Sequence, residues 1–218
     1  MLTICLVLFS YLLGSIPTAF LAGKMIKGLD LRQYGSGTVS GTGVYNHVAR
    51  WAVVPVRLFD VAKAAVPTWL GLRFRLGLPA AVSAGLAAAV GHNWPLYLGF
   101  RGGRGISTFM GTLLVVFPWG FPWLLAALAI GRLLGATAVL ALFGIALLPL
   151  LTWATGQPSA VTGACLAMLV LTVLKRLEGN RAPLPEGPAE RQRVCLNRLL
   201  LDRDTRSRDA WMLRRPPG

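Results

Sequence analysis

The chain has 218 residues, of which 55% are hydrophobic and only 14% are charged, and its mean hydropathy is +0.60. A soluble domain carries about a quarter charged residues, so this composition excludes an ordinary soluble protein and predicts an integral membrane protein. The formal charge of +14 does not indicate a nucleic-acid partner, because eleven of the 22 basic residues lie from Lys175 onward and most others flank apolar blocks. The positive-inside bias and attraction to anionic lipid produce this layout.

The first apolar block, Leu2 to Ala22, is long enough to predict a transmembrane helix. Gly14, Ser15 and Pro17 interrupt the block and should kink or thin that helix. Basic residues follow the block and do not precede it, which predicts an N-terminus outside the cell (cytoplasmic) membrane and a cytoplasmic loop after the helix.

Residues 24–51 predict a long polar loop, and two apolar blocks follow at about 52–71 and 79–97. Asp60 and Lys63 lie within the first of these blocks, three residues apart and therefore on one helical face. Ionisable groups at that depth are costly unless they pair or face a watery cavity. The pair therefore either locks two helices together or faces a substrate, and the pattern leaves both roles open.

Residues 106–131 are apolar but interrupted around Pro118, which predicts two short helices joined by a turn. Apolar blocks at 135–153 and 158–174 follow. Alternate crossings give an all-α polytopic protein with about seven transmembrane helices, short or broken in the middle, and a cytoplasmic C-terminus.

We expect a transmembrane domain at 1–177 and a basic cytoplasmic tail at 178–218. The tail is either flexible, which its polar composition favours, or a helix lying on anionic lipid. The three cysteines and two histidines lack metal-ligand or disulfide spacing, so neither a metal site nor a cofactor is predicted.

Two glycine-rich loops carry the chemistry. Residues 34–43 alternate glycines with hydroxyl residues, and residues 99–108 place Arg101 and Arg104 among glycines immediately before an apolar segment. Exposed backbone N–H groups at the start of a helix, with glycines that let an oxyanion approach, bind phosphate. Arginines add charge-assisted hydrogen bonds to the same oxygens. The pattern predicts a phosphate site at a membrane surface.

Four segments together resemble the bacterial membrane glycerol-3-phosphate acyltransferases that use acyl phosphate. Residues 91–108, GHNWPLYLGFRGGRGIST, are similar to that family's GHxxPxxxxFKGGKGVAT motif. Residues 11–19, YLLGSIPTA, resemble its first helix, and residues 30–37, DLRQYGSG, resemble the start of its first cytoplasmic loop. Asp60-x-x-Lys63 resembles the Asp-x-x-Lys of its second helix.

The resemblance implies seven transmembrane helices and a cytoplasm-facing site. There the 1-hydroxyl of glycerol 3-phosphate attacks the carbonyl of a fatty acyl phosphate, giving lysophosphatidic acid and phosphate in the first step of phospholipid synthesis. Ser36 and Arg104 are the expected catalytic residues. The expected substrate-binding residues are Gly35, Gly37, Thr42, Arg50, Asp60, Lys63, His92, Arg101, Gly102, Gly103, Gly105 and Thr108.

The chain departs from the family pattern in two motifs. The family's first-loop continuation, Gly-Ser-Gly-Asn-x-Gly-Ala-Thr-Asn-x-x-Arg, begins at Gly35, and its alanine and phosphate-binding arginine fall at Gly41 and Asn46. Other changes in this motif are at Thr38, Ser40 and Gly43. The His and Asn of a third motif, His-x-x-Asn-x-x-Arg-Leu, fall at Val170 and Val173.

Arg50 is the residue expected to supply the charge missing at position 46. The departures leave a second function class open, a non-catalytic or acceptor-switched relative that binds anionic lipid or a membrane partner. A small transporter is a third class, since broken helices and glycine loops also build sites at mid-membrane.

Overall fold

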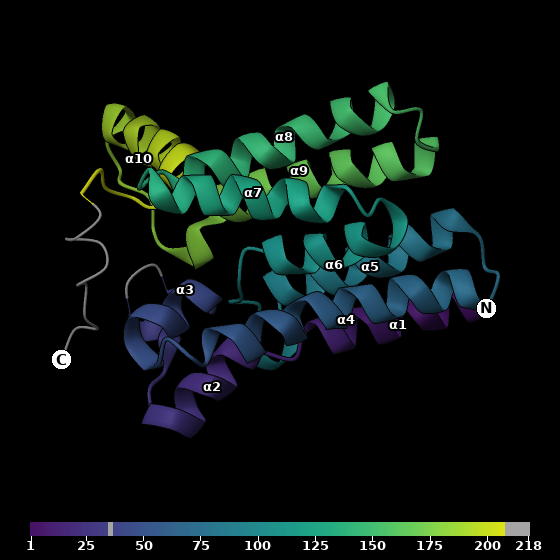
Figure 1. Ribbon diagram of the computed structural model, residues 1–218. Coiled ribbons are helices and arrows are strands. Elements are labelled where there is room, and N and C mark those ends of the chain that lie inside the picture. The colour runs from purple at the N-terminus through teal and green to yellow at the C-terminus, as the bar shows by residue number, and fades with distance from the viewer. Residues whose placement is uncertain (35–36, 208–218) are drawn as a thin grey trace.

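The computed structural model describes residues 1–34 and 37–207, and this part of the chain contains helices and turns but no β-strand. Two groups of helices pack against each other (Figure 1). The first group comprises α1 (Leu2–Gly14), α2 (Thr18–Lys27), α3 (Gly41–Gly43), α4 (Val53–Arg73), α5 (Leu78–Asn93) and α6 (Ile106–Val116). The second comprises α7 (Gly120–Leu133), α8 (Thr137–Ala154), α9 (Ser159–Glu178) and α10 (Pro188–Leu201). Short helices occupy connections: η1 (Leu31–Gln33), η2 (Val44–Val48), η3 (Leu96–Leu98) and η4 (Gly179–Arg181).

The first apolar block forms two helices, α1 and α2, on either side of Pro17, where a single kinked helix was expected. Proline lacks the N–H that would continue the helical hydrogen bonds. α1 packs closely on α5, because a Cβ on Gly14 would overlap the backbone of Ala88 and one on Gly91 would overlap the backbone of Tyr11. Small residues permit this close approach of membrane helices.

The other predicted breaks are largely confirmed. Residues 117–119 separate α6 from α7, so the apolar segment 106–131 forms two short helices. The segment 24–51 is less irregular than its composition predicts, because α2 extends into it and residues 41–48 are helical in α3 and η2. Glycine and hydroxyl residues have low helix propensity, so tertiary packing must hold this helical stretch.

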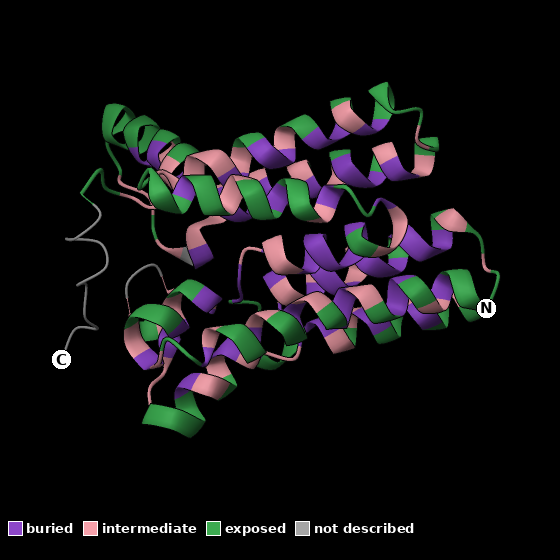
Figure 2. Ribbon diagram, in the orientation of Figure 1, coloured by how far each residue is buried: buried purple, intermediate pink, exposed green. Residues whose placement is uncertain are grey.

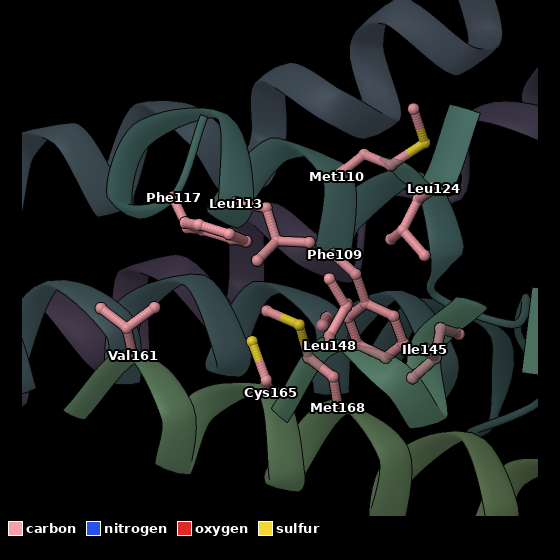
Figure 3. Packing of buried hydrophobic residues seen from close by; sticks show 11 residues of the cluster. Phe109, Met110, Leu113, Phe117, Leu124, Ile145, Leu148, Val161, Cys165 and Met168 are labelled. Carbon is pink, nitrogen blue, oxygen red and sulfur yellow. The ribbon is translucent and has the colours of Figure 1, made fainter. Parts of the chain in front are cut away.

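The main apolar core joins the two helix groups, with α6 at its centre (Figure 3). Its buried members are Ala89, Phe109, Met110, Leu113, Phe117, Leu124, Ile145, Leu148, Val161, Cys165 and Met168. The outer faces of the helices carry many exposed residues (Figure 2). Large apolar residues are among them, since Phe143, Leu150 and Leu174 are each more than half exposed. Such an exterior suits contact with lipid.

By length and composition, three helical segments within the described residues could each cross a membrane, namely Leu2–Lys27, Thr137–Ala154 and Ser159–Glu178. The shorter helices α6 and α7 are also apolar. These features agree with the predicted all-α polytopic membrane fold.

The tail differs from the flexible segment that its composition favours. Residues 188–201 form α10, which packs against α8 and α9. Arg198 is buried, donates to the carbonyl of Leu177 at 3.2 Å and pairs with Asp204 at 2.6 Å. These long-range contacts fix the helix, and a local pattern does not reveal them. The expectation for residues 208–218 lies outside the described part of the chain.

Candidate functional site: a cationic cavity

A cavity of about 540 Å³ lies between the two helix groups. The loops before α4 and α6 form one side of it, and α7, the start of α8 and the end of α9 form the other. Its volume is typical of a small-molecule site. Five arginines line it: Arg57, Arg104, Arg132, Arg176 and Arg203. Hydroxyl residues including Ser40, Thr42 and Ser107 line it too, as do apolar residues including Leu125, Leu128 and Val139.

Arg104 enters the cavity from the turn that starts α6. Gly105 adopts φ +76°, a left-handed conformation that glycine tolerates, and serves as the N-cap of α6. Arg104 Nη1 donates to the carbonyl of Lys175 at 2.6 Å, and Arg104 Nε lies 2.9 Å from Asp202 Oδ1. The guanidinium is thus oriented by the end of α9 and by a carboxylate from the turn after α10. An anionic group already occupies the position where a phosphate oxygen could pair with Arg104.

Asp60, Lys63 and His92 form a buried polar cluster beside the cavity. Lys63 Nζ lies 2.9 Å from Asp60 Oδ1 and 2.8 Å from His92 Nδ1, and it donates to the carbonyl of Ile16 at 3.3 Å. The hydroxyl of Thr18 donates to the same carboxylate oxygen at 2.8 Å. Paired and hydrogen-bonded in this way, the buried charges are compensated. Asp60 and His92 also line the cavity, so the cluster both locks helices together and borders the site.

The two glycine-rich loops converge, as the phosphate-site hypothesis requires. The backbone N–H of Val39 donates to the carbonyl of Gly102 at 3.3 Å. Asn180, after α9, donates from one amide nitrogen to the carbonyls of Gly37 at 3.0 Å and Gly102 at 3.3 Å. A single side chain therefore holds both loops. Thr38 and Arg104 line the same cavity.

The structure brings some of the predicted site residues to the cavity and not others. Gly35 and Ser36 lie outside the described residues. Thr42, Asp60, His92, Arg104 and Gly105 line the cavity. A small adjacent pocket is lined by Lys63, Gly102 and Gly103, again with His92.

Four predicted residues line neither the cavity nor the adjacent pocket: Gly37, Arg50, Arg101 and Thr108. Gly37 accepts the bond from Asn180. Arg50 is exposed and lies over the ring of Tyr45, 5.5 Å from its centroid. The hydroxyl of Thr108 is buried and donates to the carbonyl of Gly105 at 2.6 Å, which stabilises the first turn of α6.

Sequence patterns alone did not identify Arg57, Asn180 or Asp202 as site residues. Asn180 and Asp202 have φ values of +52° and +57°, and asparagine and aspartate enter this region more readily than most residues. The sequence does offer one sign of the role of Asn180: Gly179 and Asn180 together end the last apolar block, as expected of a turn with left-handed backbone. Arg57 lies one turn before Asp60 on the same helical face.

His47 also lines the cavity. Burial, with Lys27 nearby, lowers the pKa of its imidazole below the usual 6.5. The ring is therefore neutral at pH 7, and the positive charge of the cavity comes from its arginines.

Comparisons with known proteins give a consistent result. The family model for glycerol-3-phosphate acyltransferase matches residues 4–182. A glycerol-3-phosphate acyltransferase from Synechococcus sp. (strain CC9902) is 37% identical over 193 residues, covering 87% of this chain and 94% of that protein. The corresponding protein from Anaeromyxobacter sp. (strain Fw109-5) is 39% identical over 201 residues, covering 88% of this chain and 98% of that protein.

A solved structure shares the fold. The crystal structure of PlsY, an integral membrane glycerol 3-phosphate acyltransferase, in its glycerol 3-phosphate form aligns with a TM-score of 0.77 and 27% identity. The alignment covers 95% of this chain and 96% of that one. Its lysophosphatidic acid form aligns with a TM-score of 0.75. This multi-pass membrane protein, with its arginine-lined cavity between two helix groups, belongs to the glycerol-3-phosphate acyltransferase family.

Proposed function

We propose that the cavity is the active site in which a fatty acyl group passes from acyl phosphate to the 1-hydroxyl of glycerol 3-phosphate. Both substrates carry a phosphate, and one carries a long apolar chain. The arginines and hydroxyls of the lining suit the phosphates, and the apolar residues of α7 and α8 suit the start of the chain. The observation that best supports this proposal is that both glycine-rich loops converge at the cavity that Arg104 lines.

In this mechanism, Arg104 binds the phosphate of the acyl phosphate together with backbone N–H groups of the second glycine-rich loop and Ser36. The acceptor oxygen bonds to the carbonyl carbon, and the bond from that carbon to the phosphate oxygen breaks. The hydroxyl proton ends on the released inorganic phosphate. Because phosphate is a good leaving group, positioning and charge stabilisation carry most of the barrier. Asp60, Lys63 and His92 support the site.

We further propose that the protein lies in the cell membrane with its N-terminus outside and the cavity on the cytoplasmic side. The N-terminus of α1 and helix α10 lie at opposite ends of the molecule (Figure 1). Helix α2, whose last turn carries Lys24 and Lys27, lies at the same end of the molecule as α10. The positive-inside bias supports this orientation.

The experiment is phosphate release by detergent-purified protein given acyl phosphate and glycerol 3-phosphate. We expect lysophosphatidic acid and phosphate in equal amounts, and Arg104→Ala should lower kcat/KM by about 10²–10³-fold, since it removes a donor to the developing charge. Arg73→Ala, at the opposite end of α4, should leave the rate unchanged. Release of phosphate without lysophosphatidic acid would indicate another acceptor. No release at all would favour a binding role.

A further inference from the structure

Four of the five arginines that line the cavity already have partners. Arg104 pairs with Asp202, and Arg176 donates to the carbonyls of Leu199 and Ala138, each at 2.7 Å. The other two use nearby groups, since Arg132 lies over Tyr45 and Arg203 donates to carbonyls in its own turn. Arg57 differs, because it makes no hydrogen bond or ion pair within the described part of the chain.

Arg57 is held beside the polar cluster but is not part of it. It lies in the second turn of α4, one turn before Asp60, whose carboxylate interacts with Thr18, Lys63 and His92. Asp60 attracts the Arg57 guanidinium electrostatically, but that carboxylate is already shared among Thr18, Lys63 and His92, so the hydrogen bonds of this partly buried guanidinium are not completed within the described residues. Its presence on the wall of a cavity is explained if an anionic ligand completes its hydrogen bonds.

The backbone of the first loop makes room for this arginine. A Cβ on Gly41 would lie 2.9 Å from Arg57 Nε and 3.3 Å from its Cζ. The family pattern that the first loop resembles has alanine at this position and an arginine at the position of Asn46. This chain therefore lacks the methyl group that would displace the Arg57 guanidinium, and it also lacks the arginine of the loop. Asn46 and Arg57 line the same cavity.

We infer that Arg57 binds the phosphate of the acceptor, glycerol 3-phosphate, and fixes the preference of this chain for a phosphorylated polyol. The inference rests on the proposed function, in which Arg104 holds the donor phosphate. Two phosphates held together in one cavity repel each other, so each needs its own cation. Ser40 and Thr42 line the same cavity as Arg57, and their hydroxyl groups can donate to phosphate oxygens bound there.

The first test is binding of glycerol 3-phosphate alone to the detergent-purified full chain, measured by calorimetry. We expect Arg57→Gln to raise the Kd about 10- to 150-fold, the range for loss of hydrogen bonds to a charged group. Arg57→Lys should recover part of the affinity, because it restores the charge but not the planar fork. Arg73→Gln, at the far end of the same helix, should bind like the wild type. An unchanged Kd in Arg57→Gln would overturn the inference.

The second test separates acceptor from donor in turnover. Arg57→Gln should raise the KM for glycerol 3-phosphate and leave the KM for acyl phosphate and the thermal stability near wild type. Gly41→Ala should raise the same KM, because its methyl group displaces the flexible end of Arg57. A raised KM for acyl phosphate with normal binding of glycerol 3-phosphate would assign Arg57 to the donor and refute the inference. Failure of the wild type to turn over would count against the proposed function, while calorimetry would still decide the role of Arg57.

Discussion

At the scale of single residues, the second glycine-rich loop can pack against the end of α5 only because Gly102 and Gly103 have no side chains. A Cβ on Gly103 would overlap the imidazole of His92, and one on Gly102 would overlap the backbone at the end of α5. The loop therefore lies directly against the helix end that carries His92. Close contact at this point sets where Arg104 emerges into the cavity.

Gly103→Ala should lower the acyltransferase rate by at least about 100-fold, because a shift of about 1 Å in a positioning group has effects of that size. The added methyl group must displace either the His92 ring or the loop. Initial rates and size-exclusion profiles of the purified variant measure activity and folding separately. Gly163→Ala is the matched control, since its Cβ would meet no atom within 4 Å. Normal turnover in Gly103→Ala would contradict the role given to this contact.

At the scale of elements, the turns after α9 and α10 organise loops that are far away in the sequence. Asn180 ties both glycine-rich loops to the end of α9, and Asp202 places a carboxylate on Arg104. Trp94 and Lys175 both contact Glu178, which joins the ends of α5 and α9. The cavity ends of both helix groups are therefore held by hydrogen bonds and ion pairs from residues after α9 and α10 and from the last turn of α9.

Asn180→Gly should destabilise the protein by about 1–3 kcal/mol, the range for leaving a buried partner unsatisfied. Glycine keeps the left-handed backbone but removes the amide that donates to both loops. Denaturant or thermal unfolding in detergent measures the loss, and the KM for both substrates should rise because the loops loosen. Unchanged stability together with unchanged KM would argue against this link between the loops.

Asp202→Asn should lower the KM for acyl phosphate by up to about 5-fold, the range for a partly exposed ion pair of at most about 1 kcal/mol. The substitution removes the carboxylate that competes with phosphate for Arg104. Initial rates at varied acyl phosphate measure the effect. Asp204→Asn is the control, since Asp204 pairs with Arg198 and does not line the cavity. A higher KM in Asp202→Asn would mean that the carboxylate assists substrate binding.

The sequence predicts the membrane helices well, because a bilayer demands long apolar segments and proline interrupts them. It also predicts that both loops meet, since each carries phosphate-binding chemistry. It does not reveal Asn180 or Asp202, whose roles depend on contacts with residues far away in the sequence. Arg50 and Arg57 are equally basic in the sequence, and only the packing of α4 against Gly41 distinguishes the one that faces the cavity.

At the scale of the whole molecule, the cavity is shared between two helix groups that a single apolar core joins. A ligand in the cavity contacts both groups at once. Its binding energy therefore stabilises the folded arrangement of the groups as well as the site.

Glycerol 3-phosphate at 100 times its Kd should stabilise the protein by about 2.7 kcal/mol. For a chain of this length, that corresponds to a rise in Tm of roughly 5–10 °C. Differential scanning fluorimetry in detergent measures the shift, and glycerol without phosphate should have little effect. Equal shifts from both compounds would show that the cavity does not recognise the phosphate.

The shortness of α6 has a consequence for where the reaction occurs. Eleven residues rise only about 16 Å along a helix, roughly half of a hydrocarbon core of about 30 Å. Trp119 lies in the turn after α6 and is 78% exposed. Tryptophan favours the head-group layer of a membrane, so we place this end of α6 in the head-group layer on the side away from the cavity. The opposite end of α6, with Gly105, then lies near mid-depth. A lipid-soluble donor reaches this level by lateral diffusion within its leaflet, whereas a water-soluble acceptor must enter the cavity from the aqueous side of the membrane.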